Sequence, residues 1–175
     1  MKHHVSKRLP YTPDQLFALV GDVMAYPDFV PWITSMRVWN ARSPGDGVET
    51  VDAEAGVGFS FLKERFSTRV RRDPVNRQID VTLLSGPFRR LANRWEFFDA
   101  EDGATRVEFD IDFQFKSRLL EALLSANFGH AVDRLMTCFE ARARALYGHS
   151  QALIPAKAGT QAESATSTRE PPASR

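Results

Sequence analysis

The stretch VEFDIDFQF, residues 107–115, decides the fold together with the segment that follows it. Its apolar side chains alternate with acidic or polar ones, as in a β-strand with one face in the core and one in water. Residues 118–147 then contain no proline, while Ser117 can cap a helix and Gly148 can end it. We therefore predict a strand followed by one uninterrupted helix of about 45 Å.

The predicted helix carries a wide apolar stripe. Its members are Leu119, Leu120, Leu123, Leu124, Phe128, Ala131, Val132, Leu135, Met136, Phe139, Ala143 and Leu146. A stripe of this width needs a concave wall to cover it. We therefore expect a curved antiparallel sheet wrapped around the C-terminal helix, with a cavity between the two.

The segment before residue 107 predicts further strands joined by hairpins. From residue 33 onward apolar residues recur with period two. The turn signals lie at residues 43–47, 73–76, 85–87 and 102–103. Between Val57 and Val70 the apolar phase shifts by one, which predicts a β-bulge near residues 62–65. Together these patterns predict six to seven strands.

Two short helices are expected near the N-terminus. Thr12 can act as N-cap with Pro13 at the first helical position, Gln15 can complete a capping box, and Gly21 can end the helix. The next stretch, YPDFVPW at residues 26–32, is aromatic and braced by prolines, so it needs an apolar surface to pack on. The predicted fold class is therefore α+β.

Composition bounds the domain organisation and the compartment. The chain has 175 residues, of which 43% are hydrophobic, enough for one core. We predict one domain at residues 1–149 and a disordered tail at residues 150–175. A net charge of +1 gives no general attraction to DNA, and the single cysteine, Cys138, predicts neither a disulfide nor a metal site. Without a signal peptide or a membrane span, we expect a cytoplasmic protein that meets the inner membrane only peripherally.

Three segments resemble the coenzyme Q-binding START-like proteins. They are DV at 22–23 with YPDFVPW at 26–32, GPFRRLANRWEF at 86–97, and VEFDIDFQF at 107–115 with SRLL at 117–120. The resemblance implies the helix-grip fold of the START and polyketide cyclase superfamily, a tunnel for a hydrophobic ligand, and a supporting role in cellular respiration through ubiquinone binding. A bacterial branch with the same motifs is described as a toxin that associates with the large ribosomal subunit and blocks subunit joining.

The candidate ligand-binding residues are mostly aromatic. They are Phe29, Trp32, Phe61, Phe66, Asn93, Trp95, Phe109, Phe113, Leu120, Leu124 and Phe128. Any one of these rings can equally be ordinary core packing. Phe29 and Trp32 can form either a gate at the cavity mouth or a fixed plug. Asn93 shares the phase of Trp95, so we expect it to point inward, either to a quinone carbonyl or to a backbone partner. We expect no cofactor besides ubiquinone or a related lipid as ligand.

Basic residues are concentrated between Lys63 and Arg94, a stretch that contains nine basic and three acidic residues. We expect Arg90 and Arg94 to pair across strands with acidic residues of the 107–115 segment. The remaining arginines are candidates for binding anionic lipid headgroups or ribosomal RNA. These surface candidates are Arg69, Arg71, Arg72, Arg77 and Arg89.

No catalytic constellation is evident in the sequence, so we predict a protein that is not an enzyme. His3 and His4 lie at a terminus that we expect to be mobile, and no motif places a nucleophile beside His130. Glu64 and Arg65, at the expected bulge, are candidates for an inward polar pair of the kind that a cyclase-type enzyme would need. The hypotheses are therefore, in order, a quinone or lipid carrier, a ribosome-binding toxin-like factor and a cyclase-type enzyme.

Overall fold

A computed structural model describes residues 1–59 and 62–148 of the chain. Its main element is a seven-stranded antiparallel sheet in the order β1-β7-β6-β5-β4-β3-β2. The strands are β1 (Lys2–Leu9), β2 (Ile33–Gly45), β3 (Val48–Phe59), β4 (Leu62–Asp73), β5 (Gln78–Ser85), β6 (Phe88–Asp99) and β7 (Thr105–Phe115). This confirms the predicted α+β class with six to seven strands. The tail predicted for residues 150–175 lies outside the described residues.

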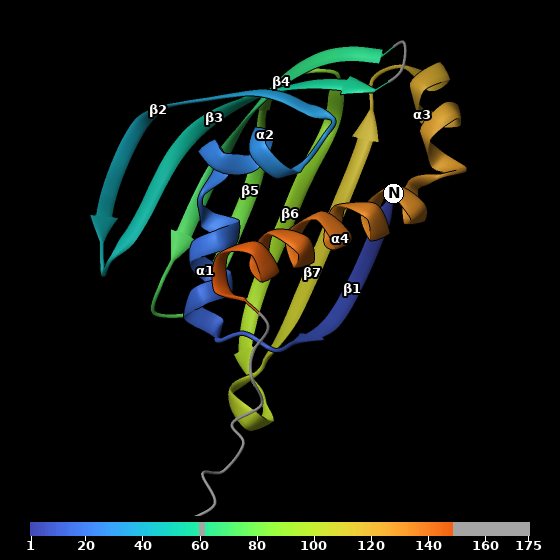
Figure 1. Cartoon of the computed structure of the whole chain (residues 1–175). Helices are drawn as coiled ribbons and strands as arrows, with labels where there is room; N and C mark the ends of the chain where they lie inside the picture. Colours follow the sequence, from blue (N-terminus) through green and yellow to red (C-terminus); the bar gives the residue numbers. More distant parts are fainter. Residues whose placement is uncertain (60–61, 149–175) are drawn as a thin grey trace, which may run out of the picture.

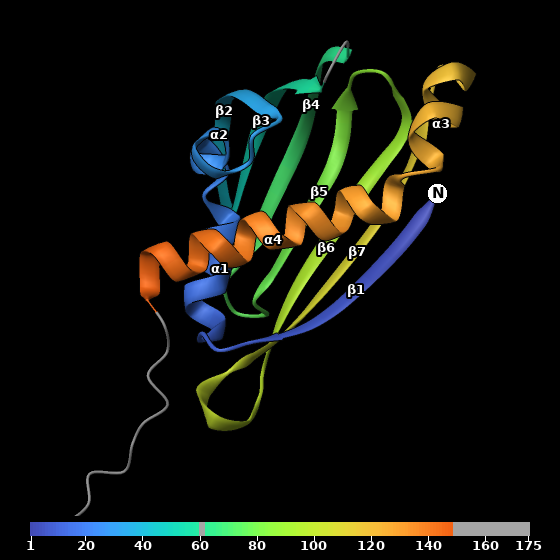
Figure 2. The same cartoon turned by 45° about the vertical axis from the view of Figure 1, so that its right-hand side comes forward.

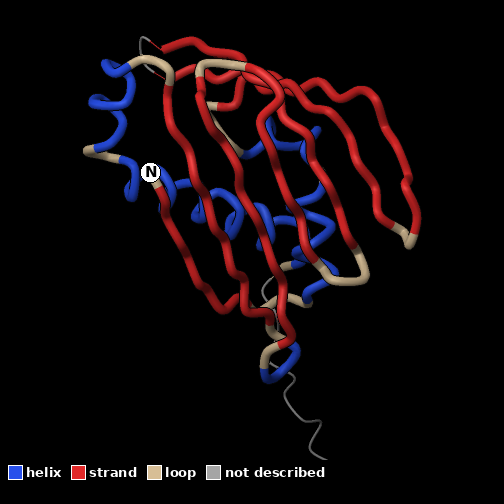
Figure 3. The backbone as a smooth tube through the Cα atoms, turned by 180° about the vertical axis from the view of Figure 1, so that it is seen from behind, coloured by secondary structure: helices blue, strands red, loops and turns tan. Residues whose placement is uncertain are grey.

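The described residues form four main helices, of which three lie on the concave face of the sheet and the fourth, α3 (Arg118–Ser125), lies beside the end of β7. The three are α1 (Pro13–Gly21), α2 (Tyr26–Phe29) and α4 (Phe128–Tyr147), with short 3-10 turns η1 (Val23–Ala25) and η2 (Glu101–Gly103) elsewhere in the chain. α4 crosses the sheet, while α1 contacts β5 and β6 and α2 contacts β2 (Figures 1 and 2). From behind, the strands lie in front of the helices, and the outer face of the sheet is turned to the viewer (Figure 3). None of the described helices is long and apolar enough to cross a membrane.

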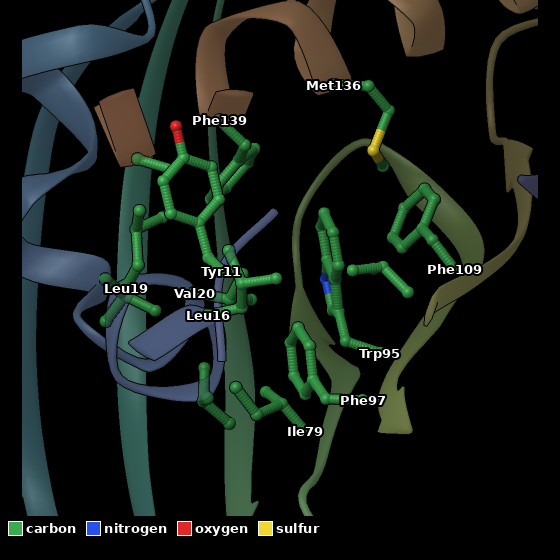
Figure 4. Close-up of a cluster of buried hydrophobic side chains, with 14 of the residues drawn as sticks. Tyr11, Leu16, Leu19, Val20, Ile79, Trp95, Phe97, Phe109, Met136 and Phe139 are labelled. Atoms are coloured by element: carbon green, nitrogen blue, oxygen red, sulfur yellow. The ribbon is translucent and has the colours of Figure 1, made fainter. Parts of the chain in front are cut away.

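Strand β7 shows the predicted alternation. Phe109 and Phe113 point inward and are each 2% exposed, whereas Asp110 and Gln114 are exposed on the outer face. The inward side chains of β5, β6 and β7 meet those of α1 and α4 in one hydrophobic core (Figure 4). Burial of this apolar surface, at about 25 cal/mol per Å², is the main term that holds sheet and helices together.

The predicted start of α1 is confirmed in detail. The Thr12 hydroxyl accepts a hydrogen bond from the Gln15 N–H at 3.2 Å, and the Gln15 side chain accepts one from the Thr12 N–H at 3.0 Å. This capping box satisfies two backbone donors that a helix end leaves unpaired. Pro13 occupies the first helical position, where it needs no donor.

Strand β1 is absent from the sequence prediction, which places His3 and His4 at a mobile terminus. β1 pairs with β7 along its whole length. His4 Nδ1 lies 2.7 Å from Asp110 Oδ1, and His4 Nε2 lies 3.0 Å from Glu108 Oε2. The prediction of a mobile terminus is wrong, because the backbone ladder and the carboxylates of β7 hold this edge strand in place.

The predicted single C-terminal helix is two helices. α3 ends at Ser125 and α4 begins at Phe128, because Asn127 leaves the helical region with φ −120° and ψ 9°. The Asn127 N–H bonds to the Leu124 carbonyl at 3.2 Å, and the Phe128 ring packs on Phe113 with centroids 4.3 Å apart. The packing of Phe128 thus fixes where α4 begins, and α3 leaves the line of α4 (Figure 2).

The bulge predicted near residues 62–65 is a hairpin instead. Phe59 pairs with Leu62, so β3 and β4 are separate strands, and the apolar phase changes because the chain reverses direction. Register shifts do occur elsewhere, in β2, in β4 between Ser67 and Thr68, and in β6. Such irregularities bend a strand and raise its twist.

Candidate ligand-binding site

Aromatic side chains on the concave face form two groups, of which the first is packed core. The Trp95 ring centroid lies 4.3 Å from that of Phe109 and 5.1 Å from that of Phe139 on α4. These three side chains are 5%, 2% and 6% exposed, and Figure 4 shows them within the buried cluster between α4 and the sheet. The cavity that they help to line measures about 20 Å³, which is room for about one water molecule. In this structure Trp95 and Phe109 therefore fill the core.

The second group is a series of five rings that we call the aromatic track. In order, its members are Phe66, Phe88, Phe115, Phe113 and Phe128, with neighbouring centroids 5.3, 4.7, 5.4 and 4.3 Å apart. Phe113 is buried and the other four are half-buried. The track runs from β4 across β6 and β7 to the first residue of α4, beside the break between α3 and α4.

The sequence prediction identifies three of the five track residues and misses Phe88 and Phe115. Phe115 shares the period-two phase of Phe113, so the alternation in β7 could have identified it. Phe88 was hidden because a register shift between Phe88 and Arg90 changes the phase of β6. Phe61, another predicted ring, lies outside the described residues.

Asn93 lies on β6 between the two aromatic groups. Its strand partners are Val81 on β5 and Ile111 on β7, and by the two-residue period it faces the same side as Leu91 and Trp95. The Asn93 side-chain oxygen is shielded from solvent and has no hydrogen-bond partner among the described residues. A buried unpaired acceptor destabilises a fold by about 1–3 kcal/mol. The structure thus presents an unused acceptor on the concave face, two residues along β6 from Leu91, the strand partner of the track residue Phe113.

Phe29 and Trp32 both contact α4. The Phe29 ring centroid lies 5.2 Å from that of Phe139, and the Arg142 guanidinium lies 5.4 Å from the Phe29 ring. The Arg134 guanidinium lies 5.4 Å from the Trp32 ring. Contacts of this kind fit a fixed plug. A gating role for either residue stays a prediction.

Helix α3 lies beside the part of the track that is formed by the end of β7 and the start of α4. A Glu121 carboxylate oxygen accepts a hydrogen bond at 2.8 Å from the last backbone N–H of β7. The predicted ligand residues Leu120 and Leu124 are half-buried on α3. Leu119 and Leu123 point away from the sheet and are 69% and 46% exposed. α3 therefore presents an apolar face to the surroundings.

Four of the five arginines predicted for surface interactions are ion-paired. Arg69 pairs with Asp52 at 2.8 Å, Arg71 with Asp73 at 3.2 Å, Arg72 with Glu49 at 3.0 Å and Arg77 with Asp99 at 2.8 Å. Hydrogen bonds from Arg69 and Asn40 lower the pKa of the Asp52 carboxyl. Arg89 is exposed. The charge of the first four is thus partly neutralised, and their role in binding stays a prediction.

The Arg72 side chain points to the concave face of the sheet, whereas those of Arg69 and Arg71 point to the outer face, because successive residues of a strand alternate between faces. Its Nη1 donates a hydrogen bond at 3.1 Å to the carbonyl of Gly21 at the end of α1, and its Nε is buried without a partner among the described residues. Arg72 therefore anchors α1 to the concave face. The expectation that it belongs to the outer surface is not met.

The predicted cross-strand pairing is confirmed for one of two arginines. Arg90 lies 2.9 Å from Asp112 on β7. Arg94 instead pairs at 2.7 Å with Asp80 on β5, which its register places on the other side of β6. The two arginines on the outer face of β6 are thus paired with carboxylates on both neighbouring strands.

The polar pair expected for a cyclase-type site is not formed. Arg65 points outward with its side chain 76% exposed, 3.9 Å from Glu54, because Glu64 and Arg65 are consecutive strand residues and face opposite sides. His130 is exposed on α4. Within residues 1–59 and 62–148, no three His, Cys, Asp or Glu side chains gather in a way that could hold a metal ion.

A curved sheet that grips a C-terminal helix over an apolar interior defines the helix-grip class of domains. A family profile described as polyketide cyclase / dehydrase and lipid transport matches residues 9–140. The chain belongs to this family, which confirms the superfamily resemblance found in the sequence.

Three similar proteins illustrate the range of the family. The chain is 64% identical to an 18 kDa protein of Caulobacter crescentus, whose solution structure has a TM-score of 0.72 and a match covering 85% of this chain and 99% of that one. It is 31% identical over 140 residues to the ribosome association toxin RatA of Escherichia coli (strain K12), covering 79% of this chain and 84% of the relative. It is 34% identical over 135 residues to the mitochondrial coenzyme Q-binding protein coq10 of Schizosaccharomyces pombe, covering 74% and 78%.

Proposed function

We propose that this protein binds an isoprenoid quinone such as ubiquinone, or a lipid of similar shape, between the sheet and the C-terminal helices, and that it supports respiratory electron transport without being an enzyme. The observation that carries the proposal is the unpaired, buried Asn93 oxygen, which lies on the same face of the sheet as the aromatic track. The name of the coq10 relative supports a quinone as the ligand.

The chemistry of a quinone suits both parts of this site. Its isoprenoid chain is purely apolar, so contact with the rings of the track gains about 25 cal/mol for each Å² removed from water. The Asn93 amide offers an acceptor to the hydroxyl of a reduced quinol and an N–H donor to the carbonyl of the oxidised quinone. A single amide can therefore hold the head group in both oxidation states.

Ligand binding requires the interior to open. The cavity of about 20 Å³ beside Trp95 is far too small for an isoprenoid chain. The break at Asn127 lies between α3 and α4, and Glu121 ties α3 to the end of β7. We propose that α3 moves about this break and exposes the aromatic track to the incoming chain.

Quinone extraction tests the proposal. Protein purified from a quinone-making host is expected to carry an extractable isoprenoid quinone. Asn93→Leu keeps the side-chain volume but removes the amide, so we expect at least about a fivefold lower quinone content, equivalent to one lost hydrogen bond. Gln114→Leu makes a comparable amide-to-leucine change on the outer face of β7 and is the control. Wild-type protein that is free of quinone and also fails to take up added ubiquinone would overturn the proposal.

We also propose that the protein works in the cytoplasm and meets the inner membrane through α3. The exposed Leu119 and Leu123 are flanked by exposed Lys116 and Arg118. Apolar side chains beside cations suit an anionic bilayer, because leucines enter the interface while cations bind headgroups. This contact would bring the aromatic track next to the bilayer that dissolves the quinone.

A second candidate function is association with the large ribosomal subunit. The 31% identity to a protein named ribosome association toxin favours it. Co-sedimentation with purified large subunits tests it, and binding is expected to weaken at high salt and in the exposed-charge variant Arg89→Gln. Absence of co-sedimentation even at low salt would exclude this candidate while leaving the quinone proposal standing.

A further inference from the structure

The outer face of β2, β3 and β4 carries a group of cations that we call the cationic face. Strand register places on it the basic residues Arg37, Arg42, Lys63, Arg65, Arg69 and Arg71, with the carboxylates Asp52, Glu54 and Asp73 among them. Six cations against three carboxylates leave an excess of three positive charges, although the whole chain has a net charge of only +1. Figure 3 shows this side of the sheet, with no helix in front of the strands.

The cations of β4 form a row along one face of the strand. Lys63, Arg65, Arg69 and Arg71 are at odd positions of one strand, and Ser67 fills the gap between them. Alternate residues of a strand lie about 6.8 Å apart. Such a row suits a chain of regularly repeated negative charges better than it suits a single anion.

Arg37 and Arg65 are the most available of these cations. They share one carboxylate oxygen, Glu54 Oε1, at 3.6 and 3.9 Å, and their side chains are 71% and 76% exposed. Ion pairs of this length and exposure hold little energy. Both guanidinium groups can therefore turn to phosphate, which they bind through paired hydrogen bonds.

An exposed tryptophan lies beside these cations. Trp39, on the edge strand β2, is 39% exposed, and the Arg37 guanidinium lies 5.0 Å from its ring. Asn40, the next residue, has a positive φ of 56°, and the register of β2 shifts between Trp39 and Arg42. Nucleobases stack on exposed aromatic rings of this kind without strong sequence preference.

A surface groove of about 380 Å³ completes the face. Its lining is Ser35, Met36, Arg37, Glu54 and Arg65. The neighbouring part of β3 carries glycine at its outward positions 56 and 58, and the Ser35 side chain lies directly over Gly56. The Ser35 hydroxyl and the Glu54 carboxylate offer hydrogen-bond partners for a ribose 2′-hydroxyl, the group that distinguishes RNA from DNA.

We propose that the cationic face binds single-stranded RNA, with phosphates along β4 and a base stacked on Trp39. The row of cations, the exposed indole and the groove together fit this partner, because a single strand presents phosphates and unstacked bases at once. The inference goes beyond the proposed lipid binding and uses a different face of the sheet. Arg69 and Arg71 of this face were identified from the sequence alone, whereas Arg37 and Trp39 were not.

Fluorescence anisotropy with a labelled oligouridine RNA tests the proposal on the full chain. We expect saturable binding whose logarithm of affinity falls linearly with the logarithm of salt concentration. Arg37→Gln with Arg65→Gln removes two phosphate contacts and should reduce that slope by about 1.4. Trp39→Leu should weaken binding at least about fivefold, whereas Trp39→Phe retains a ring and should keep most of the affinity.

The matched control is Arg90→Gln with Arg106→Gln, which removes two charges from the outer face of β6 and β7. It should leave RNA affinity unchanged, and thermal unfolding should show that every variant is folded. Asn93→Leu should bind RNA like the wild type, so the quinone and RNA proposals can fail independently. Equal losses in the two double variants, no preference for single-stranded over duplex RNA, or binding to anionic vesicles but not to RNA would each overturn the inference.

Discussion

At the scale of single residues, His4 links the edge strand β1 to β7. Its hydrogen bond to Asp110 raises the pKa of the imidazole above the usual 6.5, and the charges of Asp110 and Glu108 act in the same direction. Because the folded-state pKa is the higher one, protonation of His4 stabilises the folded chain. This contribution is full below the unfolded pKa and is lost as pH rises through the folded pKa.

We therefore expect the effect of His4→Gln to depend on pH. The variant should have a lower Tm than the wild type at about pH 5.5, and the difference should shrink as pH rises past the folded pKa of His4. Thermal unfolding followed by circular dichroism across this range measures it. His130→Gln, an exposed histidine of α4, is the control. A Tm difference that is the same at every pH would show that the charge of His4 has no part in holding β1.

Asn93 shows where residue-level prediction stops. Its inward direction follows from the period of β6, because Leu91 and Trp95 flank it at two-residue spacing. Its lack of a partner does not follow, because that depends on which residues the sheet places beside it. Val81 and Ile111 occupy those places, and neither side chain has a hydrogen-bonding group.

At the scale of elements, strands and helices with strong local signals were predictable. β7 alternates strictly, and α1 begins with a complete capping box. β1 was missed because KHHVSKRL is mostly polar and gains its stability from a partner about a hundred residues further along the chain. The boundary between β3 and β4 was missed because the change of apolar phase between Val57 and Val70 fits a bulge as well as it fits a reversal of the chain. The break before α4 was missed because no proline marks it and because Asn127 and Gly129 can each occur within a helix; packing of Phe128 decides it.

The exposed face of α3 leads to a prediction about membrane contact. Leu119→Ser with Leu123→Ser should reduce co-sedimentation with anionic lipid vesicles, because two leucines would no longer enter the interface. Both side chains are exposed, so the free energy of unfolding should change by no more than about 0.5 kcal/mol. Exposed Leu146 near the end of α4 provides the control Leu146→Ser. Undiminished vesicle binding would move the membrane contact away from α3.

At the scale of the whole molecule, the concave face divides into a packed core and an aromatic track, and this division can be measured. Phe109→Ala should lower the free energy of unfolding by about 3–5 kcal/mol, because the ring is 2% exposed and leaves a cavity. Phe88→Ala, at a half-buried ring, should cost less stability but should lower the quinone content of the purified protein. Urea denaturation and quinone extraction of the same preparations test both. A Phe88→Ala protein with full quinone content would place the ligand elsewhere.

The irregular path of β2 has a consequence for the behaviour of concentrated protein. β2 is one end of the sheet, and its register shifts at three places, two of which flank Arg42. An edge strand with bulges and charged side chains is a poor template for another strand, because few of its free backbone groups lie in line. Arg37 and Arg42 therefore also protect the edge against fibril formation between copies of the chain. Neutralising both arginines removes this protection at the β2 edge of the sheet.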